Sequence, residues 1–121
     1  MKKLFAFLFI LLLFVLAACG QNDESGIVRI IIKDAESTVL FDEELDFTKT
    51  DTLIGLLENH EEITMKGETS EYGLYITELC GVKAEEAYWA VYIDGEYAMV
   101  GVSQIPLTNQ TEIEFILTPF E

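Results

Sequence analysis

The clearest alternation of apolar and polar side chains lies between residues 88 and 117. Residues 88–93 predict a strand with two different faces, carrying Trp89, Val91 and Ile93 on one side and Tyr88, Ala90 and Tyr92 on the other. Asp94-Gly95 follows directly and is typical of a two-residue hairpin turn, because both positions need a positive φ that Gly takes freely and Asp tolerates. The chain then returns over residues 96–100, and residues 112–117 (EIEFIL) alternate again. We expect a hairpin and a closing strand that share one core.

The sequence upstream predicts a second hairpin followed by a helix. Residues 27–33 (IVRIIIK) are rich in β-branched side chains, which favour a central or near-central strand. A partner strand is expected over residues 39–47, where two apolar groups flank an acidic one. Residues 53–58 carry leucines at helical spacing, and Thr50 or Asp51 is expected to cap this helix.

Two further short strands are predicted over residues 62–68 and 72–79, with a connection over residues 81–87. The whole pattern indicates the α+β class. We expect a small β-grasp-like mixed sheet of about six or seven short strands with one helix.

The first residues have the composition of a bacterial lipoprotein leader. A short basic start precedes an unbroken apolar run over residues 4–16, and two alanines then precede Cys19. The run is shorter than the roughly 20 residues that a membrane-spanning helix needs. We therefore expect residues 1–18 to be a lipoprotein signal peptide, Cys19 to be lipidated, residues 19–26 to form a tether and residues 27–121 to form the domain. The alternatives are a plain signal peptide with a coincidental cysteine, or an uncleaved anchor.

Acidic side chains outnumber basic ones, 22 to 7, for a net charge of −15. Removal of the leader would take away Lys2 and Lys3 and leave a net charge of −17. Such a surface repels nucleic acid and anionic lipid headgroups, which excludes a nucleic-acid partner. It favours cationic partners, divalent ions or simple solubility. The clusters around residues 42–46 and His60 match neither an EF-hand nor a zinc motif, so we interpret them as a solvated face and expect no metal site.

Recognised catalytic constellations are absent from the sequence. It has no Ser–His–Asp elbow, phosphate loop or Cys–His pair. If Cys19 is lipidated, Cys80 has no partner cysteine, and its apolar neighbours favour a buried thiol over a reactive one. Paired carboxylates for glycoside hydrolysis are the remaining enzymatic alternative, and we expect the protein not to be an enzyme.

Aromatic residues gather around the predicted hairpin, namely Tyr88, Trp89, Tyr92 and Tyr97. Large flat side chains with a polar tip suit a planar, partly polar ligand such as a corrin ring. Trp89 is in phase with Val91 and Ile93, so it is either a core residue or a ligand contact. Tyr88 and Tyr92 point the other way and are candidates for an exposed recognition face.

The Tyr88-Trp89 pair, the Gly101-Val102-Ser103 step and the EIEFIL segment resemble the transcobalamin-like C-terminal domain family over residues 27–117. The resemblance implies a small α+β module, found in the vertebrate cobalamin carriers and, alone, in bacterial surface lipoproteins. It also implies that Tyr88, Trp89, Gly101, Val102 and Ser103 face the ligand. A single module is expected to bind more weakly than a carrier with a second, helical domain, because much of the ligand stays in water.

Two functions from different classes follow as hypotheses. The first is a lipid-anchored binding module on the extracytoplasmic face of a bacterial membrane, which takes cobalamin or a related corrinoid and feeds a membrane transporter. Its candidate ligand contacts are Tyr88, Trp89, Tyr92, Gly101, Val102 and Ser103. The second is a cell-surface protein–protein interaction module without a small-molecule ligand, which docks a transporter subunit or another surface protein through the same hairpin. A divalent-cation-binding domain ranks third.

Overall fold

The structure is a computed structural model that describes residues 25–71 and 73–120. The predicted signal peptide, Cys19 and most of the predicted tether lie outside the described residues. Among the residues that are described, no helix is long and apolar enough to cross a membrane.

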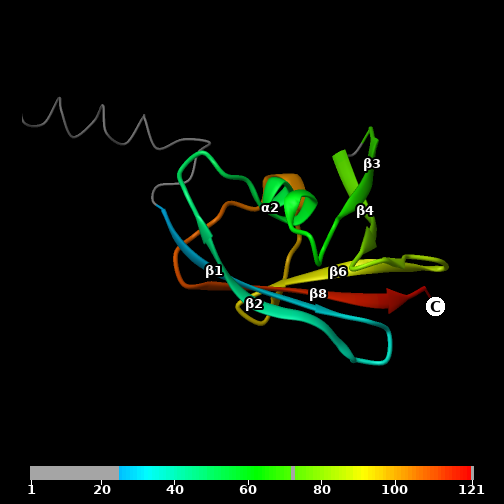
Figure 1. The fold of residues 1–121 in the computed structure, drawn as a ribbon. Coiled ribbons are helices and arrows are strands. Elements are labelled where there is room, and N and C mark those ends of the chain that lie inside the picture. Colours follow the sequence, from blue (N-terminus) through cyan, green and yellow to red (C-terminus); the bar gives the residue numbers. More distant parts are fainter. Residues whose placement is uncertain (1–24, 72, 121) are drawn as a thin grey trace, which may run out of the picture.

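The larger of two sheets has five strands in the order β2-β1-β8-β6-β7 (Figure 1). β1 (Gly26–Lys33) pairs antiparallel with β2 (Val39–Phe47) and parallel with β8 (Thr111–Pro119). β8 pairs antiparallel with β6 (Ala87–Ile93), which turns back into β7 (Glu96–Tyr97). β1 has a neighbour on each side, so the prediction of a near-central strand is confirmed.

A second layer covers one face of this sheet (Figure 1). It contains the helix α2 (Leu53–Asn59), the 3-10 helix η1 (Val102–Gln104) and a three-stranded sheet of β3 (Lys66–Ser70), β4 (Gly73–Leu79) and β5 (Val82–Lys83). η1 contacts both α2 and β4, so it joins the two parts of this layer. The α+β class is confirmed, with the strands divided between two sheets.

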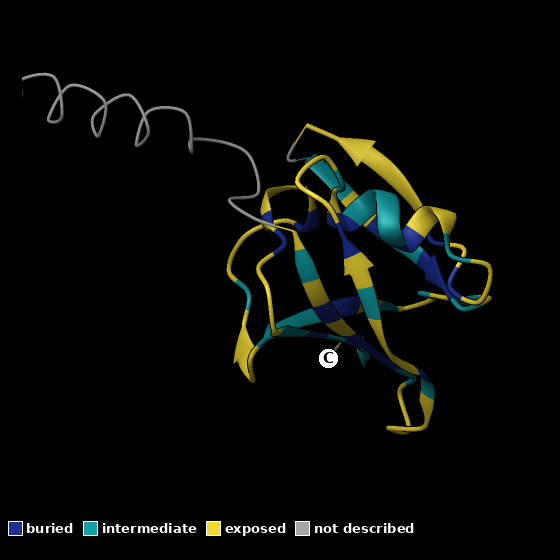
Figure 2. Cartoon of the chain, turned by 60° about the vertical axis from the view of Figure 1, so that its left-hand side comes forward, coloured by how far each residue is buried: buried dark blue, intermediate teal, exposed yellow. Residues whose placement is uncertain are grey.

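The core lies between the two layers. The strands of the large sheet carry both buried and exposed residues (Figure 2), and Val28, Ile30 and Ile32, at every second position of β1, belong to the core cluster. Ile30 of β1 and Phe115 of β8 are fully buried, and Leu53 and Leu57 of α2 belong to the same apolar cluster. The two leucines lie four residues apart and therefore on one face of the helix. Full burial of such a side chain contributes about 1.5–3 kcal/mol, which is enough to hold a two-turn helix that would not be stable alone.

The cap of α2 differs from the expectation. Thr52, and neither Thr50 nor Asp51, is the N-cap, and its hydroxyl accepts a hydrogen bond from the backbone N–H of Gly55 at 3.0 Å. The Asp51 carboxylate instead accepts from the backbone N–H of Thr48 at 2.7 Å and closes the preceding turn. All three side chains can cap a helix, so the choice was decided by where Leu53 and Leu57 meet the sheet.

Three strand boundaries also differ. The strand expected over residues 62–68 is β3, which starts at Lys66. Ile63 and Met65 are buried, but they lie in the turn and loop before it. The return strand expected over residues 96–100 is limited to β7, and the expected connection over residues 81–87 contains β5. Burial of loop side chains produces an apolar pattern that resembles a strand when no partner strand is known.

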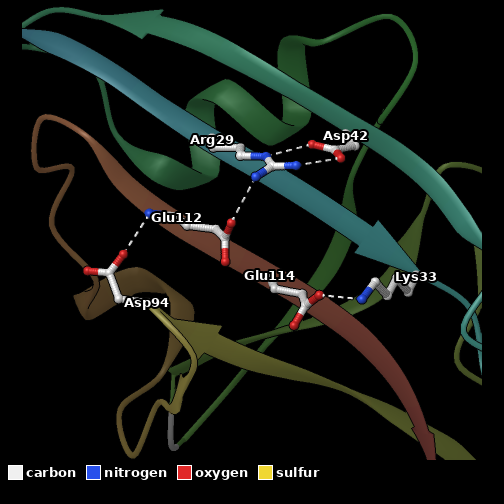
Figure 3. A network of polar contacts seen from close by, with 6 residues as sticks. All are labelled: Arg29, Lys33, Asp42, Asp94, Glu112 and Glu114. Atoms are coloured by element: carbon white, nitrogen blue, oxygen red, sulfur yellow. Dashed lines mark hydrogen bonds and ion pairs between the residues drawn. The ribbon is translucent and has the colours of Figure 1, made fainter.

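The Asp94-Gly95 turn is confirmed. Both residues have positive φ, 49° and 85°. The Asp94 carboxylate also accepts a hydrogen bond from the backbone N–H of Glu112 at 3.0 Å, which ties the hairpin to β8 (Figure 3). The position of the hairpin is therefore determined both by the conformation of its turn and by the hydrogen bond to β8.

Candidate functional site

The short length of β7 leaves one edge of β6 open. In the described part of the chain, β7 pairs with just Tyr92 and Ile93, and one more bond joins the Ala98 N–H to the Val91 C=O at 2.8 Å. Backbone groups alternate between the two edges of an antiparallel strand, so those of Trp89 point to the same open side as those of Val91. β4 of the smaller sheet lies against β6. The junction of the two sheets is consequently where a ligand can approach both backbone and side chains.

A cleft of about 450 Å³ occupies this junction, bordered by β4, β6, the loop after β7 and Phe120, which follows β8. Its volume falls within the range of roughly 300–1,000 Å³ that is usual for small-molecule sites. None of the described residues that line it carries a charge. We call it the aromatic cleft, after the five aromatic side chains in its lining: Tyr75, Tyr88, Trp89, Tyr97 and Phe120.

The rim of the aromatic cleft is unusually apolar for a protein surface. Most of the exposed large hydrophobic side chains of the described chain line the cleft, and Met99, 87% exposed, lies next to the lining residue Val100. Exposed apolar side chains that gather in one place mark binding surfaces more often than scattered ones do. The rim is therefore suited to a partner or ligand that removes it from water.

Trp89 belongs both to the core and to the cleft. It is 7% exposed, packs in the central apolar cluster and contributes to the cleft lining. The two interpretations of this residue from the sequence are thus compatible. Its buried indole Nε1 has no hydrogen-bond partner among the described residues. An unpaired buried donor costs about 1–3 kcal/mol, and such a group requires an explanation in strain or in function.

Tyr88 and Phe120 form one wall of the aromatic cleft. Their rings stack with centroids 5.5 Å apart and an interplanar angle of 27°. The backbone N–H of Phe120 donates to the C=O of Glu86 at 3.0 Å, which brings the end of the described chain beside the start of β6. This backbone bond holds the Phe120 ring against Tyr88, although the two residues are far apart in the sequence.

Tyr75 contributes from the opposite side, on β4. It lies directly across from Glu68 of β3, and its hydroxyl donates to the Glu68 carboxylate. That hydrogen bond, and then the negative charge of Glu68, raises the pKa of the Tyr75 phenol. Tyr75 therefore stays neutral and presents its ring to the cleft with its proton directed to Glu68.

Four of the six ligand contacts predicted from the sequence meet in the aromatic cleft: Tyr88, Trp89, Gly101 and Val102. Tyr92 does not line it and packs edge-on against Tyr97, with centroids 5.6 Å apart and an interplanar angle of 69°. Ser103 is exposed in η1, also outside the lining.

The contributions of β4 and of Phe120 were not predicted. Residues 74–77 alternate in character, which indicates a strand but not the strand that it faces. Phe120 lies beyond the last alternating segment and carries no local signal of its position. Tyr97 had such a signal, because it belongs to the aromatic group of the hairpin.

The exposed face of the large sheet carries ion pairs (Figure 3). The Arg29 guanidinium donates to both oxygens of Asp42, at 2.9 and 2.8 Å, and to Glu112 at 3.2 Å. Lys33 lies 2.8 Å from Glu114. The hydrogen bond from Arg29 holds the pKa of Asp42 below its usual value, and Asp42 raises that of Arg29. The acidic residues of this face are partly neutralised by ion pairs with Arg29 and Lys33.

The described residues contain no group of three or more His, Cys, Asp or Glu side chains that could hold a metal ion. His60 has a structural role, since its Nδ1 accepts from the backbone N–H of Glu62 at 3.1 Å and its ring meets that of Phe41 edge-on at 4.9 Å. Cys80 is half-buried and not fully buried, and burial, followed by the charge of Glu62, raises the pKa of its thiol. Both effects favour the protonated thiol over the thiolate.

Comparison with known proteins shows that several solved structures share this fold. A protein from Ruminococcus gnavus ATCC 29149, provisionally described as metal-binding, aligns with a TM-score of 0.63 at 20% identity over 79% of this chain and 99% of its own. Haptocorrin in complex with Cbi aligns with a TM-score of 0.63 at 15% identity over 79% of this chain, which corresponds to 26% of haptocorrin. At these identities the likeness establishes a common fold and not a common ligand.

Two further comparisons use the sequence alone. No curated protein matches the sequence significantly. A family model described as a domain of unknown function (DUF4430) matches residues 50–118, which include most of the lining of the aromatic cleft.

Proposed function

Since the chain belongs to the DUF4430 family of domains of unknown function, we propose its role from its own surface: it is a binding module that holds a ring-shaped small molecule in the aromatic cleft. A corrinoid, cobalamin or cobinamide, is the candidate ligand. The module acts by recognition and not by catalysis. The observation that carries this proposal is an uncharged cleft of about 450 Å³ with five aromatic side chains in its lining.

The chemistry of the cleft suits a flat ligand with a polar periphery. Aromatic rings offer broad apolar contact, and such contacts dominate the energetics of buried surfaces. The open edge of β6 adds the backbone N–H and C=O of Trp89, which can bond to amide groups on the ligand. The fold shared with haptocorrin, seen in complex with Cbi, supports a corrinoid among ligands of this shape.

The size of the cleft limits how much of such a ligand it covers. A corrin ring with its side chains is larger than the cleft, so the domain would bury one face of it and leave the other in water. Affinity follows the quality of the buried contacts after the cost of association is met. We therefore expect weak, micromolar binding by the isolated module.

Calorimetry with cobinamide and with cobalamin tests this proposal. The matched variants are Tyr88→Ala, which removes a cleft wall, and Tyr92→Ala, which makes the same exchange four residues away, outside the lining. We expect saturable binding that the first variant weakens by roughly tenfold, about 1.4 kcal/mol, and that the second weakens less, because Tyr92 reaches the cleft only through its contact with Tyr97. Absence of heat at high micromolar concentrations of both ligands would exclude the corrinoid.

The location is the second part of the proposal. We infer a lipid anchor on Cys19 that holds the module on the extracytoplasmic face of a bacterial membrane, where it passes its ligand to a transporter. The support is the basic, apolar and small-residue pattern of residues 1–19. Mass spectrometry of the chain from bacterial membranes tests it: Cys19 should carry acyl chains, and Cys19→Ala should leave the membrane fraction.

A protein partner is the second candidate function, favoured by the 87% exposure of Met99 beside the cleft rim. Affinity capture from detergent-solubilised membranes separates the two candidates. A stoichiometric protein partner that is lost with Met99→Ser, together with a flat corrinoid titration, would establish the second function in place of the first.

A further inference from the structure

The aromatic cleft is uncharged, although the chain around it is strongly acidic. The sequence carries 22 acidic against 7 basic side chains, yet no described lining residue belongs to either group. A ligand that enters the cleft thus moves from the negatively charged surroundings of the protein to an uncharged surface of rings and aliphatic groups. This difference between surroundings and lining constrains the charge of the ligand.

Exposed carboxylates adjoin the lining at the start of β6. Glu85 and Glu86 are both exposed and lie between the lining residues Ala84 and Ala87. Lys83, on the other side of Ala84, is the one basic side chain of the described region that neighbours a lining residue in sequence. The local balance of charge at this side of the cleft is therefore negative.

The other sides of the cleft have the same sign. Glu96 is exposed and directly precedes the lining residue Tyr97. Glu68 reaches the hydroxyl of Tyr75, another lining residue, through a hydrogen bond. The hydrogen bond thus places the Glu68 carboxylate against a ring of the cleft, while Glu85, Glu86 and Glu96 are exposed carboxylates next to lining residues in sequence.

The aromatic lining and the acidic surroundings of the cleft both favour a cationic ligand. The faces of Trp, Tyr and Phe rings are negative and attract a cation that comes within about 6 Å of the ring centre. An anion would lose its hydration in the cleft without gaining a positive partner there. We propose, building on the binding function above, that the aromatic cleft selects ring-bearing ligands with net positive charge over anionic ligands of similar size.

Three small probes that share one ring test this selectivity: benzyltrimethylammonium, benzyl alcohol and benzenesulfonate. Trp89 is the single tryptophan of the sequence, so its indole N–H gives one resolved NMR signal from within the cleft lining. The full-length chain in detergent is titrated with each probe at neutral pH. We expect the cation to bind with a dissociation constant at least about tenfold below that of the sulfonate, with the alcohol in between.

Two double variants locate the source of the preference. Glu85→Gln with Glu86→Gln removes two charges at the cleft, and Glu36→Gln with Glu43→Gln removes two exposed charges on the β1–β2 hairpin, at the opposite edge of the sheet. The first pair should reduce the ratio of the two dissociation constants several-fold, and the second should change it less. Equal effects would assign the preference to overall charge and overturn the role of the rim.

The outcomes separate this inference from the proposed function. If the sulfonate binds at least as tightly as the ammonium probe, charge selection is wrong, while a ring-binding cleft remains. If none of the three probes moves the Trp89 signal, the cleft does not bind small charged or neutral rings and charge selection is refuted, while calorimetry with cobinamide and cobalamin decides the proposed function separately.

Discussion

Phe115 and Phe120 allow one substitution to be compared in two environments on the same C-terminal segment. Phe115 is fully buried in the middle of the large sheet, opposite Val91 of β6 and Ile32 of β1. Phe120 is 64% exposed and stacks on Tyr88 at the cleft. We expect Phe115→Ala to impair folding and Phe120→Ala to impair binding.

The magnitudes follow from burial. Phe→Ala in a core costs about 3–5 kcal/mol, a large part of the roughly 5–15 kcal/mol that stabilises a domain. Phe120 keeps about a third of its surface in contact with the protein, so its truncation should cost about 0.5–1 kcal/mol of unfolding free energy. In a domain of this size 1 kcal/mol corresponds to a decrease in Tm of roughly 4–8 °C.

Urea denaturation followed by circular dichroism, on a soluble form that begins at residue 20, measures both free energies. Ligand binding is measured on the Phe120→Ala variant by the Trp89 indole signal with benzyltrimethylammonium, where we expect a loss of roughly fivefold or more. Equal destabilisation by the two variants would show that Phe120, the residue after β8, has a structural role. Unchanged binding by Phe120→Ala would show that its ring is not part of the ligand site.

Three further predictions concern the turn, the surface network and the thiol. Gly95→Ala places a side chain at φ 85° and should lower the unfolding free energy by about 1 kcal/mol, whereas Gly101→Ala, at φ −67° with open space around it, should be nearly neutral in the same urea experiment. The folded pKa of Asp42 lies below its unfolded value of about 3.9, so the Arg29 pair stabilises above that pH and its contribution is lost as the pH falls through the folded pKa. Arg29→Gln should therefore lower Tm at pH 7 but not in strong acid, and an equal difference at both pH values would contradict this account. Because the pKa of the Cys80 thiol is raised, iodoacetamide should modify Cys80 in the folded form that begins at residue 20 more slowly at neutral pH than it modifies glutathione, and a faster reaction would indicate an activated thiol.

The predictions that succeeded rest on interactions between residues close in sequence. The Asp94-Gly95 turn depends on the φ preferences of two adjacent residues, and both have the expected positive φ. α2 follows from the spacing of its leucines, and the faces of β6 follow from alternation, which places Trp89 in the core cluster. The predicted N-cap of α2 was nevertheless wrong, since the N-cap is Thr52 and neither Thr50 nor Asp51. Neighbouring side chains of equal capping ability can be distinguished only by how the helix packs against the sheet.

The aromatic cleft shows the limit of that reasoning. Alternation along β4 and β6 states which side chains share a face, but not that the two strands face each other across a junction of two sheets. The position of Phe120 depends on its backbone bond to Glu86, more than thirty residues earlier. The parallel pairing of β1 with β8 likewise joins the two ends of the described chain.

The sequence by itself therefore determined the α+β class, the hairpin, the helix and the faces of the main strands, because these depend on the conformational preferences and periodicity of adjacent residues. The family resemblance implied Tyr88, Trp89, Gly101 and Val102 as ligand contacts, which stays a prediction, and these four residues line the aromatic cleft. The tertiary structure alone decided the division into two sheets, the open edge of β6 and the aromatic lining completed by Tyr75 and Phe120. The physical reason is that strand pairing and layer packing are contacts between remote residues, whose free energy is set by shape and burial in the folded chain and leaves no local pattern.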